Sequence, residues 1–296
     1  MEQYTPILAT LNVSKSYGPV QALKNVTLSF EDERIYGLFG RNGAGKTTLM
    51  DILTAKIFTD QGQVQCLGKE IFQSPETINQ ICYMPEKHYF PKNLRVKAIL
   101  AYAQMAYPNF NVAYSGRLCH DFDLNINQKY GALSRGYQSI LRIVIGLASN
   151  ARITLLDEPV LGLDAVARDH FYSELITSFT DNPRLFVIAT HLIEESADLF
   201  NEAIIIKNGE IIRQAPIDGL LSNAFYVSGP TSKVNAFIQS RTVISSQVLN
   251  NIKTSVVQGK PDELTPISGL NFSSLTMQKL FIHLTSNKNH QEASHA

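Results

Sequence analysis

Residues 40–47 read GRNGAGKT and fit the pattern G-x-x-x-x-G-K-[ST], which commits this part of the chain to a strand, a glycine-rich turn and a helix. The apolar run IYGLFG leads into the turn, and KTTLMDILTAKI continues from it with apolar residues at helical spacing. Glycines let consecutive backbone N–H groups face a polyphosphate, and the helix N-terminus adds positive potential. The sequence therefore predicts a nucleotide-binding loop.

Two side chains of this loop carry the chemistry. Lys46 is expected to reach the β and γ phosphates, and the Thr47 hydroxyl is a natural ligand for Mg²⁺. The residues predicted to contact the nucleotide are Gly40, Arg41, Asn42, Gly43, Ala44, Gly45, Lys46, Thr47 and Thr48. A glycine-rich turn with no ligand is the alternative, and the flanking strand and helix patterns argue against it.

Two later apolar segments, both predicted to be buried strands, also end in polar side chains. ITLLDEP ends with Asp157 and Glu158, and LFVIATH ends with His191. The carboxyl ends of parallel strands meet at one crevice, so we expect these groups near the γ-phosphate. Asp157 would bind Mg²⁺, and Glu158 would polarise an attacking water. The alternatives are a solvated, helix-capping strand end for the carboxylates and an ordinary hydrogen-bonded surface position for His191.

Strand and helix patterns alternate along much of the chain, which predicts an α/β fold. Short strand patterns occupy residues 7–40, helical patterns fill about 87–150, and strands alternate with helices from 153 to about 220. This order predicts a largely parallel sheet covered on both faces and interrupted by a helical insertion. Residues 221–285 read as a small α+β unit, and the polar residues 286–296 as a disordered tail.

Composition excludes several classes of protein. The 296 residues include 26 basic and 26 acidic ones, so the net charge of zero argues against a general nucleic-acid binder. Three cysteines (Cys66, Cys82 and Cys119) with no CxxC pair are typical of reduced thiols. The apolar runs are too short to span a bilayer, and the N-terminus lacks a signal-peptide pattern. Any membrane role is expected to come through a partner.

The order of these motifs resembles the ATP-binding subunits of ABC transporters, across about residues 7–220. The resemblance rests on the loop at Gly40–Thr47, the strand ending in Asp157 and Glu158, the following LGLD, and His191. It implies a P-loop NTPase fold with a mixed, largely parallel sheet, an antiparallel N-terminal β subdomain and a helical insertion. It also implies ATP and Mg²⁺ as ligands, ATP hydrolysis, and stacking of Tyr17 on adenine.

The chain departs from the family pattern at two places. The family's signature loop, usually LSGGQ, reads LSRGY here, with Ser134 and Gly136 kept but Arg135 substituted. Glu86 stands where the family has a glutamine; it can still accept from metal-bound water but adds negative charge and cannot donate. Together with YPNF in the helical insertion and the short C-terminal unit, these departures resemble the bacitracin-type branch of export ATPases.

The resemblance implies that two such subunits sandwich ATP, so that the loop around Ser134 and Gly136 contacts the nucleotide of a second subunit. From its residues alone, LSRGYQ reads as a helix N-cap, and a capped helix N-terminus is also an anion site. Arg135 would then either add charge at that γ-phosphate or tie the loop to its neighbour, and the second reading is slightly favoured.

We therefore expect an ATPase that energises a membrane permease encoded on separate chains, for export, as a homodimer or with a related subunit. Its place would be cytoplasmic, at the inner face of the membrane, with no nucleic-acid partner. A soluble ABC-type ATPase acting on ribosomes or in DNA repair is the alternative; the single cassette and the lack of a long coiled coil argue against it. A P-loop kinase or GTPase fits less well, because the base-reading NKxD motif is absent.

Overall fold

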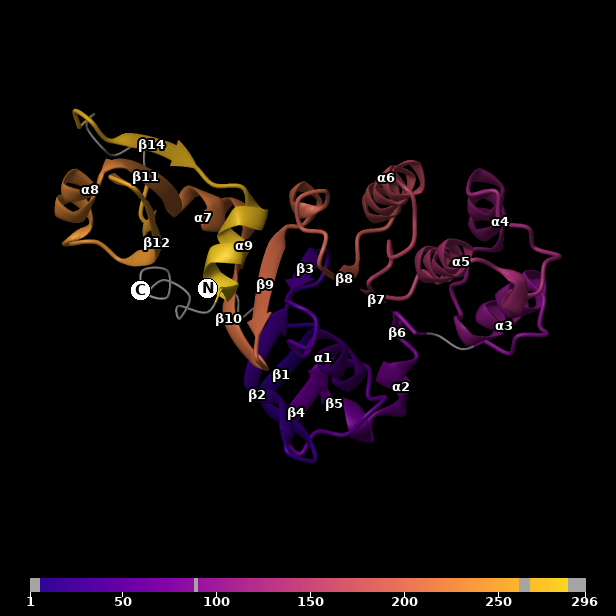
Figure 1. The fold of residues 1–296 in the computed structure, drawn as a ribbon. Coiled ribbons are helices and arrows are strands. Elements are labelled where there is room, and N and C mark those ends of the chain that lie inside the picture. Colours follow the sequence, from indigo (N-terminus) through magenta and orange to yellow (C-terminus); the bar gives the residue numbers. More distant parts are fainter. Residues whose placement is uncertain (1–5, 88–89, 261–266, 287–296) are drawn as a thin grey trace. The chain divides into compact units, whose positions relative to one another are not determined.

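The structure is a computed structural model, and it describes residues 6–87, 90–260 and 267–286. The chain divides into two compact units (Figure 1). The first unit comprises Met1–His191 and Leu199–Gln214, and the second comprises Leu192–Asp198 and Ala215–Ala296. Both candidate loops found in the sequence belong to the first unit.

A six-stranded sheet of order β10-β9-β3-β8-β7-β6 forms the centre of the first unit. Its strands are β3 (Ile35–Phe39), β6 (Ile81–Met84), β7 (Ile153–Asp157), β8 (Leu185–Thr190), β9 (Glu202–Lys207) and β10 (Glu210–Pro216). The pairs β6–β7, β7–β8, β3–β8 and β3–β9 are parallel. β10 returns along β9 through the turn Asn208–Gly209, in which both residues have positive φ, as a two-residue hairpin requires. The predicted mixed, largely parallel sheet is confirmed.

A second, antiparallel sheet of order β2-β1-β4-β5 is the predicted N-terminal β subdomain. It consists of β1 (Leu8–Tyr17), β2 (Val20–Phe30), β4 (Gln61–Cys66) and β5 (Lys69–Glu70). The helix α1 (Lys46–Leu53) buries Leu49, Met50, Ile52 and Leu53 in one core with residues of both sheets. Because the phosphate loop leads directly into α1, this core holds the loop in place.

Helices occupy the stretch in which the sequence showed only helical patterns. They are α3 (Val96–Ala106), α4 (Val112–Asp121) and α5 (Arg135–Ala148), preceded by the short α2 (Pro75–Ile78). α5 contacts β6 and β7 as well as α3 and α4, so it joins the other helices of the insertion to the sheet (Figure 1). The helix α6 (Ala165–Asp181) packs against α5. The predicted helical insertion is confirmed.

The second unit is a four-stranded antiparallel sheet of order β12-β13-β11-β14 with three helices among its described residues. Its elements are α7 (Ile217–Ser222), β11 (Ala224–Pro230), α8 (Thr231–Ile238), β12 (Val243–Leu249), β13 (Ile252–Gln258), β14 (Asn271–Ser274) and α9 (Met277–Thr285). Its core contains Phe225, Val227, Val234, Val257 and Leu270. Of the predicted tail 286–296, residues 287–296 lie outside the described part of the chain.

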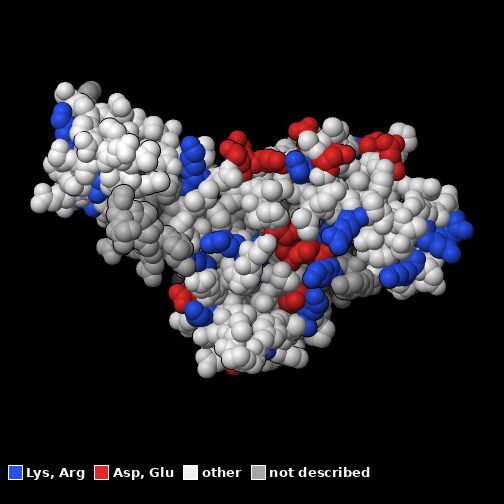
Figure 2. Space-filling model, in the orientation of Figure 1, with Lys and Arg blue, Asp and Glu red and all other residues white. Residues whose placement is uncertain are grey.

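Within the described ranges, no helix combines the length and apolar character needed to cross a membrane. The three cysteines are free and buried, and burial raises the pKa of the Cys66 and Cys119 thiols to about 11. On the face that Figure 2 shows, acidic and basic side chains are interspersed over the first unit.

Candidate functional site: a phosphate-binding cleft

The phosphate loop begins where β3 ends and closes at the first turn of α1. Gly43 and Gly45 have φ values of 78° and 111°, a region that favours glycine because other residues carry a Cβ atom. A Cβ on Gly45 would lie 2.6 Å from the carbonyl oxygen of Ala22 in β2. The loop therefore needs glycine at this position both for its backbone conformation and for its close approach to the antiparallel sheet.

Thr47 and Asp157 meet at the end of β7. The Thr47 hydroxyl donates to Oδ2 of Asp157 over 2.8 Å, although 110 residues separate them in the sequence. The other carboxylate oxygen of Asp157, Oδ1, is buried and has no hydrogen-bond partner among the residues that the structure describes. A buried carboxylate oxygen without a partner is unfavourable, and a bound cation or its water would satisfy it. This donor set of hydroxyl and carboxylate oxygens fits Mg²⁺.

Asp157 is almost completely enclosed, with 1% of its surface exposed. Burial raises the pKa of its carboxyl to about 6; the hydrogen bond from Thr47 lowers it and the nearby charge of Glu158 raises it. Burial disfavours the charged form of a carboxyl group, and negative neighbours add to this effect. The pocket is therefore one in which added positive charge is stabilised.

Glu158 is held by two cationic or hydrogen-bonding side chains. Its Oε1 lies 3.6 Å from Nζ of Lys46, and its Oε2 lies 2.8 Å from Nδ1 of His191. Nζ of Lys46 also donates to the carbonyl oxygen of Gly40 over 2.8 Å. Glu158 has φ of 48°, which is uncommon for a residue other than glycine. Its backbone N–H donates to Ala189 of β8, which keeps this conformation in place.

These residues line one cleft of about 780 Å³. The cleft is lined by Arg41, Asn42, Gly43, Gly45, Lys46, Thr47, Thr48, Glu86, Asp157, Glu158 and His191, all singled out from the sequence, and by Val20, Gln21, Ala22, Lys24, Leu161, Asn208 and Gly209, which were not. Gly40 and Ala44 are buried in the body of the loop. Tyr17 is half exposed at the end of β1 and is not among the lining residues; the start of β2 lines the cleft there.

The loop with Ser134 and Gly136 lies at a different hollow of the same unit. Ser134 is the N-cap of α5, and its hydroxyl accepts the backbone N–H of Tyr137 over 3.3 Å, which confirms the capping role. Ser134, Gly136 and Tyr137 line a hollow of about 610 Å³ together with Gly162 and Asp164. This hollow shares no lining residue with the phosphate cleft. Within one chain, the two loops therefore do not face the same space.

Gly136 and Arg135 differ sharply in their surroundings. A Cβ on Gly136 would lie 2.7 Å from the carbonyl oxygen of Gly162, so glycine is required for the contact between the two loops. Arg135 is exposed, and its guanidinium makes no hydrogen bond or ion pair with any residue that the structure describes. The favoured expectation that Arg135 ties the loop to its neighbour finds no such contact in the single chain.

Sequence reasoning missed two charged residues at or close to the site: Lys24, which lines the cleft, and Arg142. Arg142 lies in the middle of the apolar helix α5, is 6% exposed, and donates to the carbonyl oxygen of Pro85 over 2.7 Å. A single arginine in the run SILRIVIGLAS was the available signal. Two of its hydrogen-bond partners, the carbonyl oxygens of Pro85 and Asp157, are backbone atoms distant in sequence, which carry no sequence pattern.

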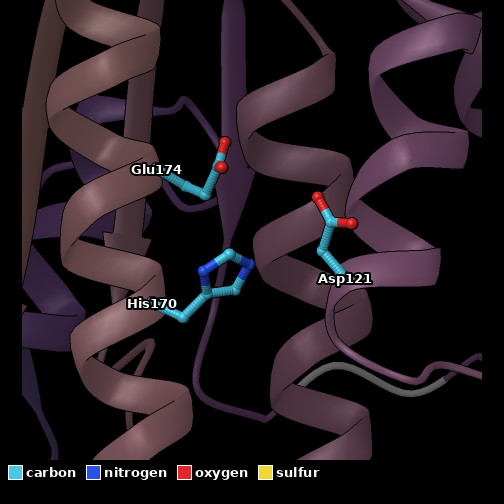
Figure 3. A group of neighbouring side chains, drawn as sticks. All are labelled: Asp121, His170 and Glu174. Atoms are coloured by element: carbon cyan, nitrogen blue, oxygen red, sulfur yellow. The ribbon is translucent and has the colours of Figure 1, made fainter.

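A second group of potential ligands lies away from the cleft, between α4 and α6. Figure 3 shows Asp121, His170 and Glu174 gathered together, and one ligand atom from each lies within 4.8 Å of the others. The guanidinium of Arg117 donates to both oxygens of Glu174, over 2.9 and 2.7 Å, and to Asp121 over 3.1 Å. A metal ion would have to displace this cation, so the group fits an ion-pair cluster that joins two helices better than it fits a metal centre.

Comparison with known proteins places these motifs in a family. The family model described as ABC transporter matches residues 23–161. The chain is 30% identical over 208 residues to the ABC transporter ATP-binding protein YtrB of Bacillus subtilis, covering 70% of this chain and 71% of that protein. It is 29% identical over 215 residues to the lipopolysaccharide export system ATP-binding protein LptB of Haemophilus influenzae, covering 70% of this chain and 89% of that protein.

Solved structures share the fold at lower sequence identity. An ATP-binding subunit of an ABC transporter superposes with a TM-score of 0.65 and 23% identity, covering 72% of this chain and 91% of that chain. A dimeric ATP-binding cassette in a post-hydrolysis state, bound to ADP and phosphate, superposes with a TM-score of 0.63 and 22% identity. The match covers 71% of this chain and 98% of that chain. These likenesses extend over the same share of the chain as the sequence matches.

Proposed function

This chain belongs to the ATP-binding proteins of ABC transporters and is an ATPase, and from that membership we propose that it energises a membrane exporter through ATP-driven dimerisation. The observation that carries the proposal is the separation of the two loops. The phosphate cleft and the hollow at Ser134 and Gly136 share no lining residue, so this loop does not contribute to the phosphate cleft of its own chain. A second subunit would supply the missing donors.

The residues of the cleft take distinct roles in this proposal. Lys46 and the backbone N–H groups of the phosphate loop bind the β and γ phosphates. Thr47 and Asp157, with Glu86 at the rim, are the residues that would hold Mg²⁺, whose charge, when bound, offsets that of the phosphates. Glu158 accepts a proton from the attacking water, and His191 orients Glu158 through the 2.8 Å contact.

Two contacts at the periphery complete the nucleotide site. Tyr17 would stack on adenine; its side chain at the end of β1 is half exposed, which is compatible with such a contact. Ser134 and Gly136 of the second subunit would bind the γ-phosphate from the opposite side. ATP favours the closed dimer because the γ-phosphate gathers donors from both chains, and loss of that phosphate reopens it.

The partners follow from this mechanism. We propose that the permease is encoded on separate chains, that the dimer is formed by two copies of this chain or with a related ATPase, and that the complex lies at the inner face of the membrane. The first 220 residues would form the ATPase domain and residues 221–285 an accessory domain. The relatives' names support transport, and LptB is named for an export system. Glu86 and Arg135 support placement in the bacitracin-type branch.

Replacement of Glu158 by Gln tests the dimerisation step. The amide keeps the size of the side chain but cannot take a proton, so turnover should fall by about 100-fold or more while ATP still binds. We expect light scattering to show a dimer with ATP and a monomer with ADP. A second substitution, Lys46→Ala, should abolish the ATP-dependent dimer. A Glu158→Gln chain that stays monomeric at saturating ATP, or that hydrolyses ATP normally, contradicts the proposal.

Purification of the intact complex from membranes tests the partner. The permease should co-purify and contain several apolar segments of about 20 residues, the length that spans a bilayer. Transport into or out of vesicles that contain the purified complex would then give the direction. Recovery of the chain with ribosomes or DNA, and without a membrane protein, would favour the soluble alternative instead.

A further inference from the structure

The guanidinium of Arg142 joins three segments that lie far apart in the sequence. Nη1 donates to the carbonyl oxygen of Pro85 over 2.7 Å and to that of Asp157 over 3.5 Å. Nη2 donates to the hydroxyl of Ser139, one turn earlier in α5, over 2.7 Å. The Ser139 hydroxyl in turn donates to the carbonyl oxygen of Leu161 over 2.8 Å. One side chain therefore connects α5 with the loops that follow β6 and β7.

The position of Arg142 is costly for a charged group. Burial lowers the pKa of its guanidinium, while the negative charges of Asp157 and Glu86 act in the opposite sense. Its hydrogen-bond partners are backbone carbonyl oxygens and one hydroxyl. An apolar side chain of similar length could fill the same space, often with no loss of stability. The packing of α5 alone therefore does not explain an arginine here.

The contacted segments are those that carry the site. Pro85 immediately precedes Glu86, Asp157 is the predicted metal ligand, and Leu161 lines the phosphate cleft. At its other end, α5 begins at Arg135, directly after its N-cap Ser134, and carries Gly136 in its first turn. Arg142 lies seven residues along the helix from Arg135, or about 10 Å at the usual rise per residue. A rigid helix of this kind transmits a displacement of its first turn to the guanidinium.

We propose that Arg142 is a positioning residue. It couples contact between the signature loop of its chain and a second subunit to the arrangement of the residues that would hold the metal ion and the attacking water in the cleft of the same chain. This inference rests on the proposed dimeric function. It adds a physical connection by which a change at one nucleotide site of the dimer reaches the other. When the first turn of α5 is drawn onto a partner's nucleotide, the guanidinium moves the backbone at Pro85 and Asp157 with it. Lysine cannot replace it, because an ammonium lacks the planar fork that reaches two carbonyl oxygens and a hydroxyl in one geometry.

The test uses the full-length chain with the substitutions Arg142→Met and Arg142→Lys. Four quantities are measured: the Kd for Mg²⁺-ATP of the monomer at low protein concentration, the kcat for ATP hydrolysis, the Hill coefficient for ATP, and the Tm. We expect the Kd to stay within about threefold, kcat to fall by at least about tenfold, and the Hill coefficient to fall toward 1 for both variants. A purely structural role would instead weaken nucleotide binding and thermal stability together and leave cooperativity unchanged.

Ser139→Ala gives a milder test that keeps the arginine and remains informative if the Arg142 variants fail to fold. It removes the link between Arg142 and Leu161 and should lower kcat and the Hill coefficient in the same direction. Ser149→Ala is the matched control, because Ser149 is also buried but donates to the carbonyl oxygen of Gly146 at the far end of α5. It should leave both quantities unchanged.

The outcomes separate this inference from the proposal on which it rests. If the unsubstituted chain hydrolyses ATP cooperatively and the Arg142 variants do so equally well, the coupling role is wrong and the dimeric function stands. An equal loss in Ser139→Ala and Ser149→Ala also overturns the coupling role. If the unsubstituted chain shows neither ATP-dependent dimerisation nor cooperativity, both proposals fall together.

Discussion

Nδ1 of His191 lies 2.8 Å from Oε2 of Glu158, and the backbone N–H of His191 lies 3.4 Å from the same oxygen. The residue that follows β8 thus presents two groups to the carboxylate of the residue that follows β7. Since a carboxylate held from one side keeps its other oxygen oriented, His191 orients Glu158 toward Lys46 and the cleft.

His191→Ala should therefore lower kcat by about 100-fold while changing the Kd for ATP little, because only the orientation of Glu158 is lost. His120→Ala is the control, since His120 is a largely exposed residue of the helical insertion. The measurement is steady-state ATPase activity together with equilibrium nucleotide binding. Equal activity of the two variants would show that His191 does not act on Glu158.

The pKa of Asp157 predicts how pH changes metal binding and stability. Burial raises the pKa of this carboxyl to about 6. Metal ligation needs the deprotonated form, so the affinity for Mg²⁺ in the presence of ATP should fall about tenfold per pH unit below 6. Calorimetric titrations between pH 5 and 8 measure this dependence. Asp157→Asn should bind Mg²⁺ weakly at every pH.

Without ligands the same group acts on stability in the opposite sense. The folded-state pKa lies above the unfolded value, so the stability linked to this proton is fully present below about pH 4 and is lost as pH rises through about 6. Asp157→Asn should therefore be more stable than the parent chain at pH 7.5, by about 3 kcal/mol, and the difference should shrink at pH 5. Denaturant unfolding of both chains at the two pH values checks it. An equal difference at both values contradicts it.

Gly136 is predicted to tolerate no side chain. Its Cβ would lie 2.7 Å from the carbonyl oxygen of Gly162, so Gly136→Ala must displace one of the two loops and should lower ATPase activity by about tenfold or more. Gly116→Ala is the control. Gly116 is an exposed position in α4 with open space where a Cβ would be, and alanine there should stabilise the helix by up to about 1 kcal/mol. Full activity of Gly136→Ala would refute the tight contact.

Arg135 distinguishes two readings of the signature loop. Its guanidinium has no hydrogen-bonding or ionic partner among the described residues of the chain, which favours a contact with the phosphates of a second subunit. Removal of one charge-assisted hydrogen bond should raise the ATP concentration for half-maximal dimer formation by about tenfold in Arg135→Ala, measured in the Glu158→Gln background. Arg135→Lys should retain most of the effect. A lower thermal stability of the monomer with unchanged dimerisation would instead identify a tie within the chain.

The phosphate loop, the carboxylates and the fold class could all be predicted from sequence because each is encoded locally. GRNGAGKT demands its strand, turn and helix, and ITLLDEP marks a buried strand that ends in charge. Three strand ends with polar residues were enough to predict a shared crevice, since parallel strands align their carboxyl ends. The helical insertion followed from apolar spacing in the same way. These features depend on neighbours within a few residues.

What only the tertiary structure decided depends on contacts between distant backbone atoms. Arg142 could be seen as one charge in an apolar helix, but its partners at Pro85 and Asp157 are carbonyl oxygens, which every residue has. The absence of Tyr17 from the cleft lining and the presence of β2 there reflect the packing of one sheet on another. The separation of the Ser134 loop from the phosphate cleft likewise depends on tertiary packing. No residue type encodes this separation, because it results from how α5, β7 and their loops pack together.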